Sequence, residues 1–218
     1  MKELKVFRDP IYGYVKVEED LIWKLIQTKE FQRLRRIHQL GGVFVVFHTA
    51  EHSRFSHSLG VYEVARRIIT EVKAIKETLT TEEKLITLCA ALLHDLGHGP
   101  YSHAFETVFN TVHEEYTIMI IESNKTEVHQ VLESYKKGFS HQIANVIGKN
   151  CYRDECNSEN CGHQIIKRII SSQLDADRLD YLQRDAYYSG ATYGEIDLER
   201  IIRSFLVVDN KIAFKYTS

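Results

Sequence analysis

Three separate segments of the chain carry the kinds of side chain that bind divalent metals. His57 stands in RFSHS, His94 and Asp95 are adjacent in LLHDLGHG, and Asp177 stands in LDADRLDY. Two imidazoles and two carboxylates suit a borderline cation such as Zn²⁺, Fe²⁺, Mn²⁺, Co²⁺ or Ni²⁺. Four protein ligands leave coordination positions for water and for a phosphate oxygen, as hydrolysis requires. These residues therefore predict a divalent metal site with hydrolytic chemistry.

Taken singly, each of these residues has a simpler explanation. His57 falls on the apolar stripe of a predicted helix, so a hydrogen-bonded core histidine would account for it. His94 and Asp95 end the most hydrophobic helical segment, where ionisable groups are costly unless each has a partner. The stretch HDLGHGPYSH adds His98 and His103 around a Gly-rich turn. So many ionisable groups in one predicted place favour a functional site.

The segment SSQLDADRLDYLQRDAYYSG carries a second set of polar residues at helical spacing. Asp177, Tyr181 and Asp185 lie at i, i+4 and i+8, and Arg178 joins them through i+3 and i+7. A solvated face with intrahelical Asp–Arg pairs is the common explanation of such spacing. The tyrosine and the second aspartate on the face of Asp177 favour a binding surface instead.

Composition narrows the class of protein. The chain has 218 residues, 44% hydrophobic and 27% charged, which is typical of a soluble protein with one domain over residues 1–218. A net charge of −2 and no basic patch interleaved with aromatics predict no nucleic-acid site. No apolar run approaches the ~20 residues of a membrane span, and the charged N-terminus is no signal peptide. Four cysteines without a dense framework indicate a reducing, cytoplasmic setting.

Hydrophobic periodicity predicts a mainly α domain with two small β-hairpins. We expect hairpins over 4–17 and 205–216, a polar loop over 149–162, and a strand or buried loop over 43–47. Long helices are expected from Leu21 to Leu40, from near Ser56 past Ile69, and from a cap at Thr80 or Thr81 through Leu96. Further helices are expected over 103–110, 113–122, 126–135, 139–148, 163–171, 175–188 and 197–205.

The remaining candidate ligands are Cys151, Cys156, Cys161 and His163, spaced C-x4-C-x4-C-x-H. This spacing departs from the usual zinc patterns, so incidental thiols in a surface loop are favoured over a structural zinc site. Cys89 lies in the apolar helix and is expected to be a core residue.

Six blocks of the chain, in order, resemble the HD superfamily and, within it, the deoxynucleoside triphosphate (dNTP) triphosphohydrolases. They are DPIYGYV, EFQRLRRIHQLGG, HSRFSHSLGVYEVA, LLHDLGHGPYSHAFE, HEEYT and LDADRLDYLQRDAYYSG. The resemblance covers nearly the whole chain and implies an HD-domain helical bundle that hydrolyses dNTPs to deoxynucleoside and inorganic triphosphate. Because the family continues beyond the second hairpin, it also implies that this N-terminal catalytic portion lacks a C-terminal helical region.

The resemblance implies a role for each matching residue. The metal ligands would be His57, His94, Asp95 and Asp177, with Mg²⁺ expected on the substrate phosphates. Arg54 and Arg178 match triphosphate-binding residues, and the wall around the deoxyribose matches Gln39, Leu40, Tyr181 and Asp185. The catalytic group would be His98, His103, Glu106 and His113. We expect His113, oriented by Glu106, to protonate the departing O5′ and the other two histidines to bind phosphate, although sequence leaves open which histidine acts.

The resemblance also implies a nucleotide effector site between subunits of a homo-oligomer, a dimer or a tetramer. Lys5, Gln32 and Arg35 match residues of that site, and ordinary surface pairs are the alternative. Gln27 stands where regulated relatives carry an aspartate that reads guanine. A glutamine lacks the anionic pair of acceptors that grips the guanine edge, which weakens the case for activation by a guanine nucleotide.

Two other functions stay open. One is another HD-type nucleotide phosphohydrolase, either a nucleotidase or a cyclic-nucleotide phosphodiesterase. Tyr181 and Asp185, with Gln39 and Leu40 upstream, favour the dNTP reaction over these. The other is a nucleotide-binding assembly module with weak or no turnover. The intact set of metal ligands argues against that module, and the C-terminal half that the resemblance implies is missing keeps it open.

Overall fold

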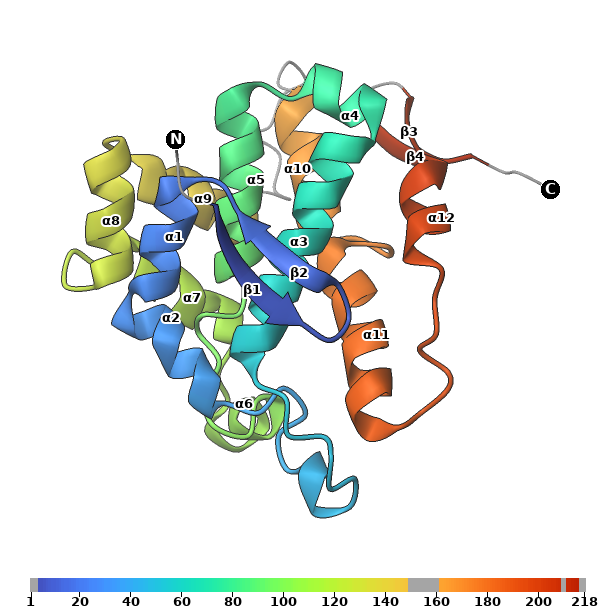
Figure 1. Cartoon of the computed structure of the whole chain (residues 1–218). Coiled ribbons are helices and arrows are strands. Elements are labelled where there is room, and N and C mark those ends of the chain that lie inside the picture. Colours follow the sequence, from blue (N-terminus) through green and yellow to red (C-terminus); the bar gives the residue numbers. More distant parts are fainter. Residues whose placement is uncertain (1–3, 149–160, 209–210, 216–218) are drawn as a thin grey trace.

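The computed structural model of the protein describes residues 4–148, 161–208 and 211–215, and these form a mainly α domain (Figure 1). Its α-helices are α1 Asp20–Gln27, α2 Lys29–Arg33, α3 Arg54–Glu71, α4 Lys73–Thr78, α5 Thr81–Leu93, α6 His103–Phe109, α7 His113–Glu122, α8 Glu127–Tyr135, α9 Phe139–Ile147, α10 Cys161–Ile170, α11 Ala176–Ser189 and α12 Leu198–Ser204. Short 3-10 turns are η1 Leu34–Arg36 and η2 Val43–Val45. The antiparallel hairpins pair β1 Lys5–Asp9 with β2 Gly13–Val17, and β3 Phe205–Val208 with β4 Lys211–Phe214. The expected fold class is confirmed.

Helix α3 forms the centre of the molecule. It packs against α5 and α11, and the β1–β2 hairpin lies across it (Figure 1). Side chains such as Tyr62, Ile68 and Leu93 are fully buried along these contacts. Their removal from water supplies most of the stabilisation, roughly 1.5–3 kcal/mol for each large apolar side chain. The central layer therefore holds three helices in fixed relation to one another.

Helix α5 begins where its sequence predicts. Thr80 caps it by accepting a hydrogen bond from the Glu83 backbone N–H, and the Glu83 carboxylate accepts one from the Thr80 backbone N–H. This capping box satisfies two amide groups that the helix start would otherwise leave unpaired. The helix is buried from Ile86 onward and includes Cys89, which is a core residue as expected.

Two expectations about the N-terminal half are wrong. The single helix expected from Leu21 to Leu40 is broken at Thr28, whose backbone is extended and whose hydroxyl caps α2 by accepting from the Phe31 N–H. The break turns α2 so that Phe31 enters the core. The apolar run 43–47 is neither a strand nor buried, because it forms η2 on the surface, with Val45 78% exposed.

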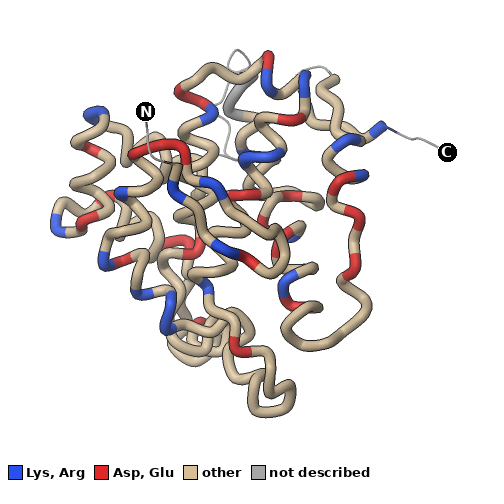
Figure 2. Tube along the Cα trace, viewed as in Figure 1, with Lys and Arg blue, Asp and Glu red and all other residues tan. Residues whose placement is uncertain are grey.

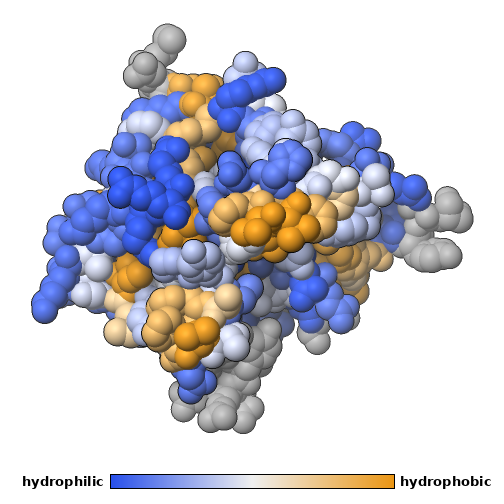
Figure 3. Space-filling view, turned by 90° about the horizontal axis from the view of Figure 1, so that it is seen from below, coloured by the Kyte–Doolittle hydropathy of each residue, from blue (hydrophilic) through white to orange (hydrophobic). Residues whose placement is uncertain are grey.

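The surface is mixed in character. Acidic and basic residues are interspersed along the elements in Figure 2, which matches the net charge of −2. Figure 3 views the molecule from the end that carries η2 and α6 in Figure 1, and apolar patches lie on this face. None of the helices in the described ranges is both long and apolar enough to cross a bilayer. Cys151 and Cys156 lie outside these ranges, as do the side chains of Cys161 and His163, so the four-residue zinc alternative stays a prediction.

Candidate metal centre and active site

Three elements bring the predicted metal ligands together. His57 comes from the first turns of α3, His94 directly follows α5, and Asp177 lies in the first turn of α11. Asp177 Oδ1 is 3.0 Å from His57 Nε2 and 3.7 Å from His94 Nε2. Ligand atoms of His57, His94 and Asp177 all lie within 4.8 Å of one another, and those of Asp95 form a second such group with His98 and His113. Asp95 adjoins the first group, with Oδ2 3.6 Å from His57 Nε2 and Oδ1 3.4 Å from His94 Nε2.

The donor set of this cluster fits a divalent cation. The other ring nitrogen of each histidine is already engaged, since His57 Nδ1 is 2.8 Å from Asp180 Oδ2 and His94 Nδ1 is 2.9 Å from the Ala91 carbonyl. Both Nε2 atoms are buried and make no hydrogen bond. An imidazole whose Nδ1–H is donated to an oxygen presents its Nε2 lone pair to a metal. The buried Nε2 atoms and the carboxylates therefore form a cradle for a cation.

The electrostatics of the cluster favour a positive charge at the same place. Burial opposes charge on His57, but the carboxylates of Asp177 and Asp180 outweigh it and raise the pKa of His57 to about 10. Burial likewise opposes ionisation of Asp177, but His57 and His94 hold its pKa below the ordinary value. Without a metal, this site stabilises a proton, and a divalent ion would replace that proton.

Asp95 is held as a carboxylate by a buried arginine. Burial alone would raise the pKa of Asp95, but the Arg54 guanidinium and the nearby histidines hold it well below its usual range. Arg54 Nη1 donates to Asp95, and Nε donates to Ser102 Oγ at 3.0 Å. Only 4% of the Arg54 side chain is exposed. Arg54 thus supports the metal-ligand candidate Asp95 directly, in addition to the triphosphate-binding role that the resemblance implies.

The turn that follows Asp95 has an unusual backbone. Tyr101 and Ser102 both have positive φ values, 61° and 52°, which residues with a Cβ rarely adopt. The hydroxyl of Ser102 holds this conformation by donating to the His38 carbonyl at 3.0 Å while it accepts from Arg54. Such backbone strain is typical of functional sites. Here the strained residues directly precede His103, the first residue of α6.

A histidine cluster lies beside the metal-ligand candidates. The rings of His98 and His113 stack with centroids 3.8 Å apart, and His98 Nε2 is 3.3 Å from Asp95 Oδ1. Glu106 Oε1 is 2.6 Å from His113 Nδ1, and Glu106 Oε2 is 2.7 Å from His103 Nδ1. All four predicted catalytic residues therefore lie together, next to Asp95.

The members of this cluster differ in charge state. Burial lowers the pKa of His98 to about 4 despite the adjacent Asp95, so His98 is neutral near pH 7. Burial opposes ionisation of Glu106, but the hydrogen bonds of His103 and His113 outweigh it and lower its pKa to about 2. Glu106 is therefore an anion that orients two imidazoles, and a neutral His98 is a poor proton donor.

Helix α7 is fixed against the HD turn by a close backbone approach. Thr117 Oγ1 donates to the His94 carbonyl and accepts from the Gly97 N–H at 2.8 Å. A Cβ on Gly97 would lie 2.1 Å from the His113 carbonyl oxygen, so only glycine permits this contact. The position of His113 is therefore set by the same segment that carries the metal-ligand candidates.

The residues expected around a deoxyribose flank the cluster. Asp185 Oδ1 is 2.7 Å from His52 Nε2, and the His52 ring stacks on Tyr188. Gln39 lies beside Arg54, whose Nη2 donates to the Gln39 carbonyl. The side-chain Oε1 of Gln39 is buried and accepts no hydrogen bond from the described residues. Leu40 and Tyr181 are half-buried. Arg178 is 52% exposed at the start of α11, with Nε 4.0 Å from Asp175 Oδ2.

The expected effector residues lie apart from this cluster. Lys5 Nζ lies 4.5 Å from the Trp23 ring centroid, and the Arg35 guanidinium carbon lies 3.5 Å from that of Phe55. Phe7 contacts both aromatic rings, so a row of three rings joins the two cations. Gln32 donates to the Ile26 carbonyl and accepts from Arg35 Nε. These contacts match the surface-pair alternative. Arg35 is exposed and Lys5 is half-buried, and effector binding stays a prediction.

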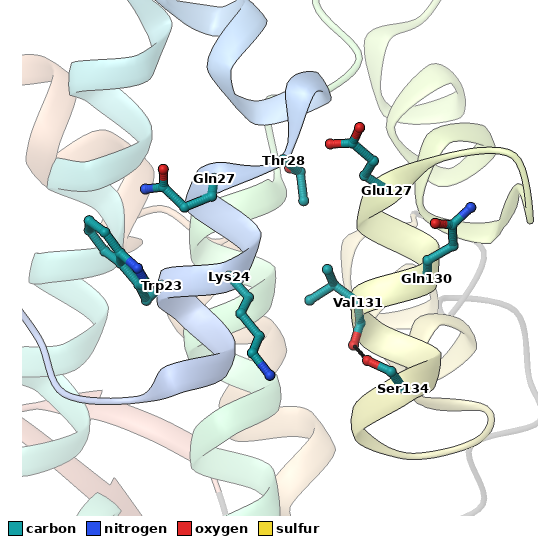
Figure 4. A pocket seen from close by; sticks show the side chains of 8 residues that line it. All are labelled: Trp23, Lys24, Gln27, Thr28, Glu127, Gln130, Val131 and Ser134. Atoms are coloured by element: carbon teal, nitrogen blue, oxygen red, sulfur yellow. Dashed lines mark hydrogen bonds between the residues drawn. The ribbon is translucent and has the colours of Figure 1, made fainter. Parts of the chain in front are cut away.

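Next to this row, a groove of about 430 Å³ runs between α1 and α8 (Figure 4). Trp23 and Gln27 line one wall, and Glu127 and Gln130 line the other. Gln27, which stands where regulated relatives carry an aspartate, is exposed there. The groove therefore belongs to the surface on which effector binding was expected, and not to the metal-ligand cluster.

Sequence reasoning missed a buried network behind His57. Asp180 and Arg184 are both fully buried on α11, and Asp9 and Tyr12 join them from the β1–β2 hairpin. The signal was present, because Asp180 follows Asp177 by three residues and precedes Arg184 by four. Helical spacing therefore placed both on the polar side of α11.

Comparisons with known proteins agree with this geometry. The chain is 51% identical over 215 residues to the uncharacterized protein YwfO of Bacillus subtilis (strain 168), covering 99% of this chain and 47% of YwfO. It is 31% identical over 237 residues to the human deoxynucleoside triphosphate triphosphohydrolase SAMHD1, covering 96% of this chain and 37% of that protein. A phosphohydrolase structure from Bacteroides thetaiotaomicron VPI-5482 has a TM-score of 0.81 at 32% identity, covering 98% of this chain and 49% of that chain.

The chain thus spans about half, or less, of the length of these relatives.

A match to a family model places the metal-ligand candidates within a known domain. Residues 54–185 match the HD domain family, and this range contains His57, His94, Asp95 and Asp177. Because the match covers more than half of the chain, the protein belongs to the HD domain family.

Proposed function

We propose that this protein hydrolyses dNTPs to deoxynucleoside and inorganic triphosphate. The observation that carries the proposal is the placement of a histidine–glutamate cluster directly beside a metal-ligand cluster. Asp95 of the metal-ligand cluster contacts His98 of the histidine–glutamate cluster. The similarity to SAMHD1, which is named as a dNTP triphosphohydrolase, supports the choice of substrate.

The metal-ligand residues would supply the electrophilic half of the reaction. A divalent cation held by His57, His94, Asp95 and Asp177 would act as a Lewis acid toward a phosphate oxygen. Arg54 keeps Asp95 ionised in a buried position, which preserves the negative charge that such a cation needs. The partial exposure of Asp177, 36% of its side chain, leaves an open side through which phosphate and water could enter.

The histidine cluster would supply the proton. As water adds to the α-phosphorus and the bond to O5′ breaks, the departing oxygen needs a proton. His113 is the candidate donor because Glu106 orients it through Nδ1. His98, with its pKa lowered to about 4, and the exposed His103 would instead contact phosphate oxygens. Arg178 would approach the triphosphate from the start of α11.

The deoxyribose would lie between α11 and the loop before α3. Asp185, held by His52, would accept a hydrogen bond from the 3′-hydroxyl, and Tyr181 would lie against C2′. Gln39 and Leu40 would complete this wall. A ribose 2′-hydroxyl would meet the tyrosine ring, so ribonucleotides should be poor substrates.

The test is hydrolysis of each dNTP and each matched ribonucleotide with Mn²⁺ or Mg²⁺, with release of triphosphate, pyrophosphate and phosphate measured separately. Triphosphate from dNTPs only, lost in Asp177→Asn with its metal content measured in parallel, supports the proposal. Release of phosphate or pyrophosphate would indicate another HD-type nucleotidase.

Two further measurements test the expected effector site and assembly. Repeating the assay with added GTP or dGTP tests the effector site of Lys5, Gln32 and Arg35. Light scattering tests the expected homo-oligomer.

A further inference from the structure

The carboxylate of Asp180 has a complete set of buried partners, and one of them is the metal-ligand candidate His57. Its Oδ2 is 2.8 Å from His57 Nδ1 and accepts from Arg184 Nε at 2.9 Å. Its Oδ1 accepts from Arg184 Nη2 at 2.9 Å and from the Tyr12 hydroxyl at 2.8 Å. A carboxylate with four such contacts to three residues in the protein interior has little freedom to move.

Arg184 extends the network to the N-terminal hairpin. Its side chain is fully buried, and its Nη1 donates to Asp9 Oδ2 at 2.9 Å. Asp9 Oδ1 in turn accepts from the backbone N–H groups of Ile11 and Tyr12 at the hairpin turn. The two carboxylates outnumber the one guanidinium, so a net negative charge is buried behind the His57 ring. Such a charge is costly to bury unless a cation lies nearby.

The close packing of α3 against α11 restricts the position of the Asp180 carboxylate. α3 crosses α11 at Gly60, where a Cβ would lie only 1.8 Å from Asp180 Oδ1. The backbone of α3 therefore approaches the carboxylate closely, one turn after His57. An ion pair that served stability alone would not need to contact a metal ligand at this distance.

We propose that Asp180, held by Arg184 and Asp9, is a positioning residue that fixes the His57 ring with Nε2 toward the metal-ligand cluster. The inference rests on the metal site of the proposed function and not on its substrate. It couples the β1–β2 hairpin to the metal centre through three consecutive side-chain contacts.

Asp180→Asn tests the proposal while changing the shape of the side chain least. An amide NH₂ at the Oδ2 position would face two donors, His57 Nδ1–H and Arg184 Nε–H, so the imidazole would turn or exchange its protonated nitrogen. At the Oδ1 position the NH₂ would face Arg184 Nη2. We expect the dissociation constant for Zn²⁺ or Co²⁺ to rise about 10–100-fold, as for other residues that support a metal ligand.

The measurement is competition of the metal-free full chain with a chromophoric chelator, together with ¹⁵N chemical shifts of the histidine ring in the zinc-loaded protein. In the wild type, His57 should carry its proton on Nδ1, and Asp180→Asn should shift that resonance. Glu133→Gln is the control for a general loss of stability, because Glu133 of α8 accepts hydrogen bonds from Gly138 and Ser140 at the start of α9 and contacts none of the metal-ligand candidates. It should lower the melting temperature without changing metal affinity.

Asp9→Asn and Tyr12→Phe keep the test decisive if Asp180→Asn does not fold. Each removes an outer contact of the network, and each should weaken metal binding in the same direction by a smaller factor. A folded Asp180→Asn protein, or a folded Asp9→Asn protein, that binds metal as tightly as the wild type would overturn the proposal. Because metal binding is measured without nucleotide, failure of the dNTP reaction would leave this result unaffected.

Discussion

At the scale of single residues, three of the four metal-ligand candidates are held by a second partner that leaves one atom for the cation. Asp180 holds His57, the Ala91 carbonyl holds His94, and Arg54 holds Asp95. The same arrangement recurs in the histidine cluster, where Glu106 binds Nδ1 of two rings. The orientation of the candidate ligands and of the two imidazoles therefore depends on these neighbouring groups.

His113→Ala should lower kcat about 10²–10⁴-fold, the usual contribution of a positioned acid, without lowering metal content. The physical reason is that the leaving O5′ loses its proton donor while the metal ligands are untouched. Steady-state kinetics and metal analysis on one sample provide the measurement. His141→Ala, an exposed histidine on α9, is the matched control and should leave kcat unchanged. If His98→Ala lost kcat and His113→Ala kept it, the roles of the two histidines would have to be exchanged.

Glu106 predicts how stability depends on pH. Its folded pKa of about 2 lies below the ordinary 4.5, so its contribution is complete above about pH 4.5 and is lost as pH falls toward 2. Glu106→Gln should therefore destabilise the protein at pH 7, on the order of 1–3 kcal/mol, and the difference should shrink in acid. Urea unfolding at pH 7, 4.5 and 3 measures it. A difference that stayed constant across this range would contradict the assignment.

The types of the site residues were predictable from the sequence, but their contacts were not. The order of His57, His94, Asp95 and Asp177 was enough to predict a metal site, since each stood in a helical pattern. A role for Asp180 was not predicted, because the spacing of the polar residues on α11 favoured Tyr181 and Asp185 as the binding residues. Its role depends on Asp9, 171 positions earlier in the chain, and no local pattern links two residues so far apart.

At the scale of elements, glycines set how closely the site-bearing helices approach. Gly60→Ala should destabilise the protein by about 1–3 kcal/mol and weaken metal binding, because the new methyl group would overlap the Asp180 carboxylate and the Arg184 guanidinium. Thermal unfolding and the chelator competition measure the two effects. Gly42→Ala is the matched control, since nothing lies within 4 Å of its Cβ position and its φ is −90°. It should change stability by less than about 0.5 kcal/mol.

Elements were predictable where local chemistry and tertiary packing agree. The capping box of Thr80 and Glu83 placed the start of α5 correctly, because two reciprocal hydrogen bonds define it. The periodicity of residues 21–40 suggested one helix, yet Thr28 ends α1 because its hydroxyl is used to start α2. The valines of residues 43–47 favoured a strand or a buried loop. Hydrophobicity alone could not show that no element of the described ranges covers Val45 and Val46.

At the scale of the whole molecule, a metal ion would cross-link segments that are distant in sequence. Its ligands come from α3, from the residues after α5, and from α11, which together form the central layer of the fold (Figure 1). The cluster buries carboxylates and imidazoles whose charges are best balanced when a cation is present. Folding stability and metal binding should therefore be linked.

Removal of the metal should lower the melting temperature. At a free metal concentration of 100 times the dissociation constant, the bound ion stabilises the folded state by about 2.7 kcal/mol. For a chain of this size that corresponds to roughly 5–10 °C. Differential scanning calorimetry before and after treatment with a chelator, and again after addition of Mn²⁺ or Zn²⁺, measures the shift. Asp177→Asn should show little difference between the two states, because it lacks the carboxylate whose Oδ1 lies 3.0 Å from His57 Nε2 and 3.7 Å from His94 Nε2. Equal melting temperatures for the loaded and the stripped wild type would instead mean that the four ligands do not share one ion, and the metal site would have to be abandoned.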